Sequence, residues 1–186
     1  MRRSSGTIVS VKVPINWERM TKRQRTRLSH ITGRDTRVIR AYLGVIERHQ
    51  KQLVKGDKWK RIDIVQLDRL TLTALRHRDP KKRRLEVPHD FKAKFPNISV
   101  NELQECRDVA VNMWTSYLRK GGSPPLHMEG KRKRKIPRNI FPKLFQLINR
   151  PDLTIKHWLE IRDSLDSVRQ GRRVHVLDVA EVEDEL

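Results

Sequence analysis

The sequence predicts an α+β protein in which a small antiparallel β-sheet is interrupted by an insertion of three helices. Apolar residues alternate with polar ones near both ends of the chain, at residues 7–15, 158–162 and 173–179, as in strands with one buried face. Between these ends, apolar residues recur every three to four positions in three separate stretches, as in amphipathic helices.

Charge is the strongest feature of the composition. The 186 residues include 42 Lys and Arg against 22 Asp and Glu, which gives a net charge of +20. Residues 152–186 hold five basic and nine acidic residues, so residues 1–151 carry 37 basic and 13 acidic ones. Such an excess of one sign favours a polyanion as the partner.

The N-terminal quarter of the chain predicts a strand and then a connector. Residues 7–15 (TIVSVKVPI) alternate over their whole length, and Pro14 places the end of this strand at a sheet edge because it cannot donate to a ladder. Residues 18–37 are rich in Arg and Lys, and we expect them to form a basic connector.

The first two helices of the insertion follow this connector. One is expected over about residues 36–54, with Asp35 or Thr36 as its cap. The other is expected over about residues 63–78, with Asp63 as its cap.

Residues 97–118 give the clearest helix signal, after an irregular stretch over residues 81–97. Ser99 and Glu102 form a capping box. The apolar stripe consists of Leu103, Cys106, Ala110, Met113, Trp114, Tyr117 and Leu118. The polar residues Glu105, Arg107, Asp108 and Asn112 are expected on the other, exposed face. On this pattern Cys106, Trp114 and Tyr42 are core residues.

The C-terminal part returns to β-structure. An exposed basic linker is expected over residues 121–136, and the runs at 158–162 and 173–179 should pair as a hairpin around Gln170-Gly171. We expect the N-terminal strand to join them. The predicted organisation is a β domain of residues 1–17 and 137–180, a helical insertion of residues 18–136 and an acidic tail of residues 181–186.

Enzyme chemistry is not predicted. The seven histidines show no metal-ligand spacing, and the single cysteine excludes a disulfide within the chain. We find no phosphate-binding loop or nucleophile motif, so we expect no cofactor, no metal and no catalytic residue. No signal peptide or membrane-spanning run is recognisable, which predicts a cytoplasmic, nucleoid-associated protein with no membrane partner.

Lys and Arg clusters are the candidate nucleic-acid contacts, because cations beside helix ends bind phosphates with little sequence readout. Trp59, which lies among basic residues, is the candidate for stacking on a base. The candidate set is Arg34, Arg37, Arg40, Trp59, Lys60, Lys81, Lys82, Arg83, Arg84, Lys131, Arg132, Lys133, Arg134, Lys135, Arg138, Arg172 and Arg173.

The order of motifs resembles a known family. The helix VNELQECRDVAVNMWTSYLR is followed by a basic linker with prolines, by IPRNIFPKLF and by HWLEIRDSLDSVRQGRRVHVLDV. This order resembles the N-terminal half of transposon-encoded TnpB-type (OrfB) RNA-guided nucleases, especially archaeal ones, which are relatives of the CRISPR type V effectors. The family's helix pattern matches Glu102 to Tyr117, and its strand–turn–strand pattern matches Gln170 to Val179.

This resemblance implies a wedge barrel, similar to an oligonucleotide-binding fold, that is interrupted by a helical recognition lobe. It implies guide-like RNA, target DNA or both as partners. The family's catalytic carboxylates and zinc ribbon lie beyond the matched region, so the chain is expected to bind nucleic acid without cleaving it.

Two other functions stay open. A stand-alone DNA-binding regulator would use two helices as a helix-turn-helix, although the links over residues 55–62 and 79–98 are long for that motif. An interaction module would pair its apolar stripes with a separately encoded nuclease half.

Overall fold

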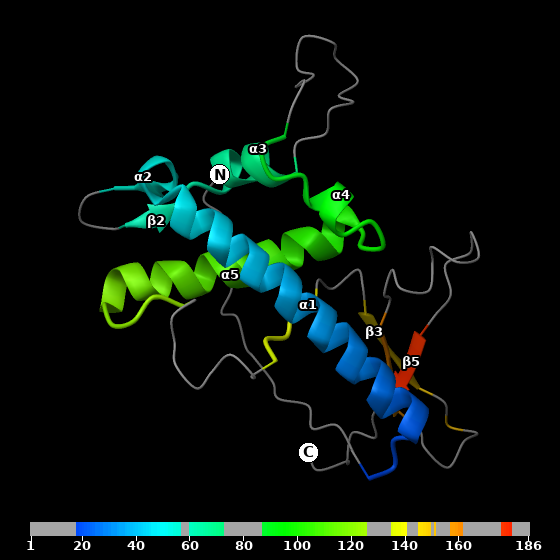
Figure 1. Cartoon of the computed structure of the whole chain (residues 1–186). Helices are drawn as coiled ribbons and strands as arrows, with labels where there is room; N and C mark the ends of the chain where they lie inside the picture. The colour runs from blue at the N-terminus through cyan, green and yellow to red at the C-terminus, as the bar shows by residue number, and fades with distance from the viewer. Residues whose placement is uncertain are drawn as a thin grey trace, which may run out of the picture.

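The fold is mostly helical, with small antiparallel sheets of two and three strands. A computed structural model of the chain describes residues 18–56, 60–72, 87–125, 135–140, 145–149, 151, 157–161 and 176–179. In chain order its elements are α1 (Lys22–Arg48), α2 (Gln50–Leu53), β1 (Val54–Lys55), β2 (Arg61–Ile62), α3 (Ile64–Thr71), α4 (Phe91–Lys94), α5 (Val100–Lys120), β3 (Phe145–Asn149), β4 (His157–Ile161) and β5 (Val176–Val179). Figure 1 shows α1 crossing α5, with α2 and α3 near one end of α1 and the three-stranded sheet near the other.

Helix α5 begins and ends at the predicted signals. The Ser99 side chain accepts a hydrogen bond from the Glu102 amide, and the Glu102 carboxylate accepts one from the Ser99 amide at 2.9 Å. This confirms the capping box. At the other end Gly121 has a φ of +73°, a backbone conformation in which glycine avoids the strain of a side chain.

Helix α1 begins well before the predicted position. Its cap is Thr21, whose side chain accepts from the Gln24 amide while the Gln24 side chain accepts from the Thr21 amide. The prediction of a connector over residues 18–37 is therefore wrong from Lys22 onward. The capping box can be recognised in the sequence. However, the Arg residues and Gly33 that follow it obscure the apolar periodicity by which a helix is predicted.

The main core lies between α1 and α5. Its buried apolar residues include Val38, Ile39, Tyr42, Leu43 and Ile46 from α1 and Leu103, Cys106, Ala110 and Trp114 from α5, with Leu53, Leu67 and Phe91 from the elements between them. The predicted burial of Tyr42, Cys106 and Trp114 is confirmed, since each exposes 1% or less of its surface. Burial raises the pKa of both the Cys106 thiol and the Tyr42 hydroxyl.

Three short helices, α2, α3 and α4, lie between α1 and α5 in the described part of the chain. Asp63 caps α3 as predicted, by accepting from the Gln66 amide at 3.2 Å. The helix ends at Thr71, and Leu72 is its C-cap, so the predicted continuation fails there because apolar periodicity does not mark an end. Residues 73–78 of that prediction lie outside the described residues.

Helix α4 falls in the stretch over residues 81–97 that was predicted to be irregular. The Asp90 side chain accepts from the amides of Lys92 and Ala93, at 2.9 Å each, and starts this single turn. The part of the stretch over residues 81–86 lies outside the described residues.

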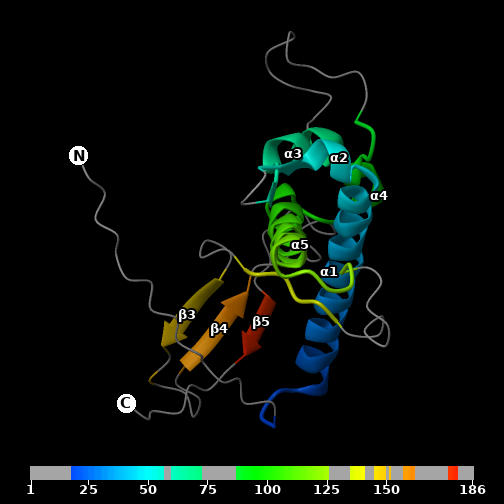
Figure 2. The same cartoon turned by 90° about the vertical axis from the view of Figure 1, so that its left-hand side faces the viewer.

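The strands form two separate sheets. In the small hairpin, Val54 of β1 lies opposite Ile62 of β2. The larger sheet has the order β3-β4-β5, and both of its strand pairs are antiparallel. The antiparallel pairing of β4 with β5 confirms that the two runs pair as predicted, while the predicted turn at Gln170-Gly171 lies outside the described residues. Strand β3 was not predicted, because the mildly apolar residues 140–148 do not define a secondary structure. Figure 2 shows this sheet beside the N-terminal half of α1, with β5 nearest to the helix.

The described strands do not close into a barrel. The strand predicted over residues 7–15, which was expected to join the C-terminal hairpin, lies outside the described residues, as does the acidic tail. The barrel is therefore still a prediction.

Candidate nucleic-acid interface

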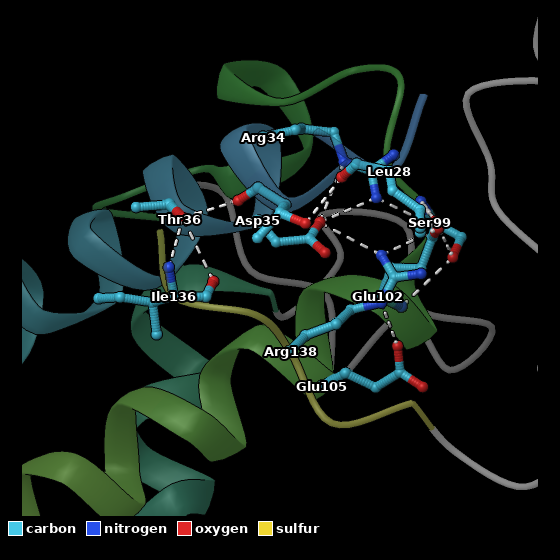
Figure 3. Close-up of polar contacts among 10 residues, drawn as sticks. Leu28, Arg34, Asp35, Thr36, Ser99, Glu102, Glu105, Ile136 and Arg138 are labelled. Atoms are coloured by element: carbon cyan, nitrogen blue, oxygen red, sulfur yellow. Dashed lines mark hydrogen bonds and ion pairs between the residues drawn. The ribbon is translucent and has the colours of Figure 1, made fainter. Parts of the chain in front are cut away.

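Five charged side chains from three parts of the chain meet inside the protein (Figure 3). Arg34 and Asp35 come from α1, Glu102 and Glu105 from α5, and Arg138 from the segment 135–140. Each of these side chains exposes 8% or less of its surface. We call them the buried ion cluster.

Arg138 holds the buried ion cluster together. Its Nη1 atom lies 3.3 Å from Asp35 Oδ1 and 3.2 Å from Glu102 Oε1, and its Nε atom lies 2.8 Å from Glu105 Oε2. Arg34 Nη2 lies 2.9 Å from Asp35 Oδ1 and 3.5 Å from Glu102 Oε1. The two guanidinium groups therefore link α1, α5 and the segment 135–140.

Two sequence predictions change as a result. Arg34 and Arg138 were expected to contact phosphates, but both are already paired with carboxylates inside the protein. Glu105 was expected on an exposed face of α5 and is fully buried. The physical reason is that this face of the helix is covered by α1 and by Arg138, and their opposite charges make the burial of carboxylates possible.

Arg107, also expected on the exposed face of α5, is buried as well. Its Nη1 atom lies 2.6 Å from Asp68 Oδ2, and its Nη2 atom lies 2.7 Å from Asp108 Oδ1. Arg107 therefore joins α5 to α3 in the same way that Arg138 joins α5 to α1.

Residues 135–138, which we call the strap, run along α1. The Ile136 amide donates to Thr36 Oγ1 at 2.7 Å, and Lys135 Nζ donates to the Ser29 carbonyl and hydroxyl. Lys135 and Ile136 were predicted to belong to an exposed linker. Residues 126–134 of that linker lie outside the described residues.

The remaining candidates fall into two groups. Arg37, Lys60 and Lys135 are exposed, so these three can reach a ligand, whereas Arg40 is half-buried. Trp59, Lys81, Lys82, Arg83, Arg84, Lys131, Arg132, Lys133, Arg134, Arg172 and Arg173 lie outside the described residues.

All exposed charged residues of α1 are basic. The fully exposed residues of this helix include five cations, Lys22, Arg23, Arg25, Arg37 and Arg48, and no acidic residue. The two acidic residues of the helix, Asp35 and Glu47, are buried and half-buried respectively. The helix therefore separates its charges, with cations toward solvent and one carboxylate held inside by arginines.

A surface pocket of about 670 Å³ opens beside Arg37. One wall is the middle of α1, and the other is the segment Lys94–Ile98 between α4 and α5. The residues that line it are Ser29, His30, Gly33, Arg34, Arg37, Lys94, Phe95, Pro96, Asn97 and Ile98. None of these is acidic, so the pocket is suited to an anion.

Sequence reasoning missed Lys94, His30 and Phe95 as site residues. His30 lies more than 60 positions before Lys94 and Phe95, and only the approach of α1 to the segment before α5 brings them together. A local signal did exist for Lys94 and Phe95, because FKAKF alternates apolar and basic residues.

Comparisons with known proteins add no assignment to this geometry. No family model matches the chain, and no curated protein or solved structure shows significant similarity to it.

Among the residues that the structure describes, no three His, Cys, Asp or Glu side chains are grouped to hold a metal ion. None of the described helices has the length and apolar content that crossing a membrane requires.

Proposed function

We propose that this chain binds nucleic acid, either RNA or DNA, through exposed basic surfaces and does not cleave it. The observation that supports this best is the exposed side of α1, where five cations face solvent without an acidic residue among the fully exposed positions. A duplex or single strand presents phosphates at regular intervals along its length, and a long basic helix is a suitable complement.

The phosphate contacts of this proposal are the exposed cations. They include Arg37, Lys60 and Lys135 from the sequence prediction and Lys94, which the structure adds. Arg34 and Arg138 are left out because their partners are internal. Phosphate contacts of this kind give steep salt dependence and little sequence readout.

The resemblance to the N-terminal half of TnpB-type nucleases makes a guide-like RNA our preferred ligand. Helices α1 to α5 precede the three-stranded sheet in the chain, as expected for a recognition lobe inserted before the main part of a wedge domain. In this proposal base pairing within the bound nucleic acid reads sequence, while the protein reads backbone and shape.

A helix-turn-helix regulator fits the geometry less well. That motif needs two helices joined by a tight turn. Here α1 and α3 are separated by α2, β1 and β2, and α3 and α5 are separated by 28 residues, counted from Leu72 to Ser99.

Sequencing of co-purified nucleic acid tests the proposal. The chain is purified at low salt, and the bound nucleic acid is extracted, sequenced and compared with the total cellular pool. We expect a discrete enriched RNA that is released as the salt concentration rises. Ribosomal RNA and random DNA in bulk proportions would reduce the function to non-specific polycation binding, and metal-dependent cleavage by pure protein would contradict the non-cleaving role.

A further inference from the structure

The pocket beside Arg37 has the size of a ligand site. Its volume of about 670 Å³ lies within the range of roughly 300–1,000 Å³ that small-molecule sites occupy. Gly33 lines it from α1, and a Cβ atom at this position would have no neighbour within 4 Å. The wall on the α1 side is therefore open.

The rim of the pocket carries positive charge. Arg37 on α1 and Lys94 at the end of α4 are both exposed, and they come from opposite walls. His30 is also exposed at this rim. Arg34 lines the wall, but its charge is matched by Asp35 and Glu102 behind it. Arg37 and Lys94 are thus the two groups available to a phosphate.

Phe95 supplies an aromatic side chain to the lining of the same pocket. Its ring packs edge-on against Phe91 at a centroid distance of 5.5 Å, and Phe91 in turn contacts Tyr42 at 4.3 Å in the core. The ring is half-buried, and Lys94 Nζ lies 5.8 Å from its centroid. An aromatic ring that the core holds in place loses little freedom when a second ring stacks on it.

Cations beside an anchored aromatic ring are the combination that binds single-stranded nucleic acid. We infer that this pocket takes one unpaired nucleotide of a bound strand, with the base stacked on Phe95 and its phosphate bound by Arg37 and Lys94. The inference rests on the proposed function and adds a preference for single-stranded regions. A base inside a duplex is already stacked on both faces and cannot enter.

Photo-crosslinking and binding measurements test this inference. A short RNA strand containing one 5-iodouridine is bound to the full chain and irradiated, and mass spectrometry identifies the cross-linked residue. We expect Phe95. In Phe95→Leu, which keeps an apolar side chain but removes the stacking surface, single-strand affinity should fall about five- to tenfold. Affinity for a duplex of the same length should not change.

A second variant keeps the test valid if Phe95→Leu folds poorly. Gly33→Leu places a side chain in the pocket from the opposite wall, where the structure leaves open space. Gly44→Leu is the matched control, because Gly44 also has open space on the same helix but does not line the pocket. We expect Gly33→Leu to lose the cross-link and to weaken single-strand binding, whereas Gly44→Leu should retain both.

The outcomes separate this inference from the proposed function. If wild type binds both nucleic acids and neither Phe95→Leu nor Gly33→Leu changes single-strand affinity, only the pocket inference is overturned. Equal loss of single-strand and duplex binding in Phe95→Leu overturns it as well. If wild type binds neither nucleic acid, both proposals fail.

Discussion

Two arginines one helical turn apart have opposite environments. Arg34 exposes 7% of its surface and is paired with Asp35 and Glu102, whereas Arg37 is exposed at the rim of the pocket. Both contribute equally to the net charge of +20. Of the two, only Arg37 contributes to the positive surface that a ligand contacts. The net charge therefore overestimates the number of cations that are available for binding.

Position relative to α5 explains the difference. Arg34 lies on the side of α1 that meets α5 and the strap, where Glu102 and Asp35 are its partners. Three residues later, after a turn of about 300°, Arg37 lies about 60° around the helix axis from Arg34, and at this position the side chain is exposed. The buried Arg34 therefore links elements of the fold, while the exposed Arg37 is accessible to a ligand.

The largest effect on stability should come from a substitution in the buried ion cluster. We expect Arg138→Met to lower the free energy of unfolding by about 3–5 kcal/mol, because it leaves Asp35, Glu102 and Glu105 with only one guanidinium group. Urea unfolding followed by circular dichroism measures the change. Arg37→Met is the matched control and should stay within about 0.5 kcal/mol of wild type. Equal stabilities of the two variants would mean that Arg138 contributes no more than a surface residue.

Local elements of this fold could be predicted from the sequence. Ser99 with Glu102, and Asp63 alone, mark helix starts by local chemistry, and the structure retains both. The β4–β5 pairing follows from two alternating runs. The start of α1 was missed because the Thr21 capping box precedes a polar, Arg-rich turn in which no apolar stripe is visible.

The buried ion cluster could not be predicted in this way. Charged residues on a helix indicate a solvent face by default, and the exception here depends on Arg138, which lies 103 positions after Asp35. The pocket has the same origin, since Phe95 and Arg37 are brought together by tertiary packing. Sequence pattern therefore predicts elements, whereas this site is defined by contacts between them.

Removing the exposed positive charges at the pocket rim should weaken RNA binding and leave the stability of the fold unchanged. We expect the double variant Arg37→Gln and Lys94→Gln to weaken RNA binding about tenfold or more and to lower the salt slope by about 2. Titrations at several salt concentrations, read by fluorescence anisotropy, give both quantities.

The matched control removes the same charge at the other end of α5. Arg119 and Lys120 are exposed in the last turn of α5, roughly 30 Å along the helix from its start beside the pocket. Their double replacement by Gln should weaken binding less. Equal effects of the two double variants would mean that the pocket rim is no more important than any other basic surface.

Replacing glycines of α1 by alanine should have a smaller effect on the free energy of unfolding. Gly44→Ala should raise the free energy of unfolding by about 0.5–1 kcal/mol, because alanine is the better helix former and its Cβ atom meets no neighbour within 4 Å. Gly33→Ala should stabilise the helix by a similar amount. Thermal and urea unfolding measure both variants. A destabilised Gly44→Ala would reveal a contact on this side of α1 that involves residues outside the described part of the chain.

The smallest expected effect is a pH dependence at the His49–His89 contact. The two Nε2 atoms lie 2.8 Å apart, so one ring donates and the other, neutral ring accepts. Burial, followed by the nearby charges of His49, Arg48 and Lys94, lowers the pKa of His89 below its ordinary value of 6.5. This pair links the end of α1 to the residues just before α4.

Linkage gives the direction of this effect. Below pH 6.5 the unfolded chain binds a proton at His89 more readily than the folded chain does, so the free energy of unfolding should fall as the pH decreases toward the lowered pKa of the folded state. Above pH 6.5 the contribution should be constant. His89→Gln removes the titrating group, and urea unfolding at about pH 7.5 and about pH 5.5 should then show a weaker pH dependence than in wild type. An identical pH dependence in both proteins would show that protonation of His89 does not contribute to the pH dependence of the free energy of unfolding.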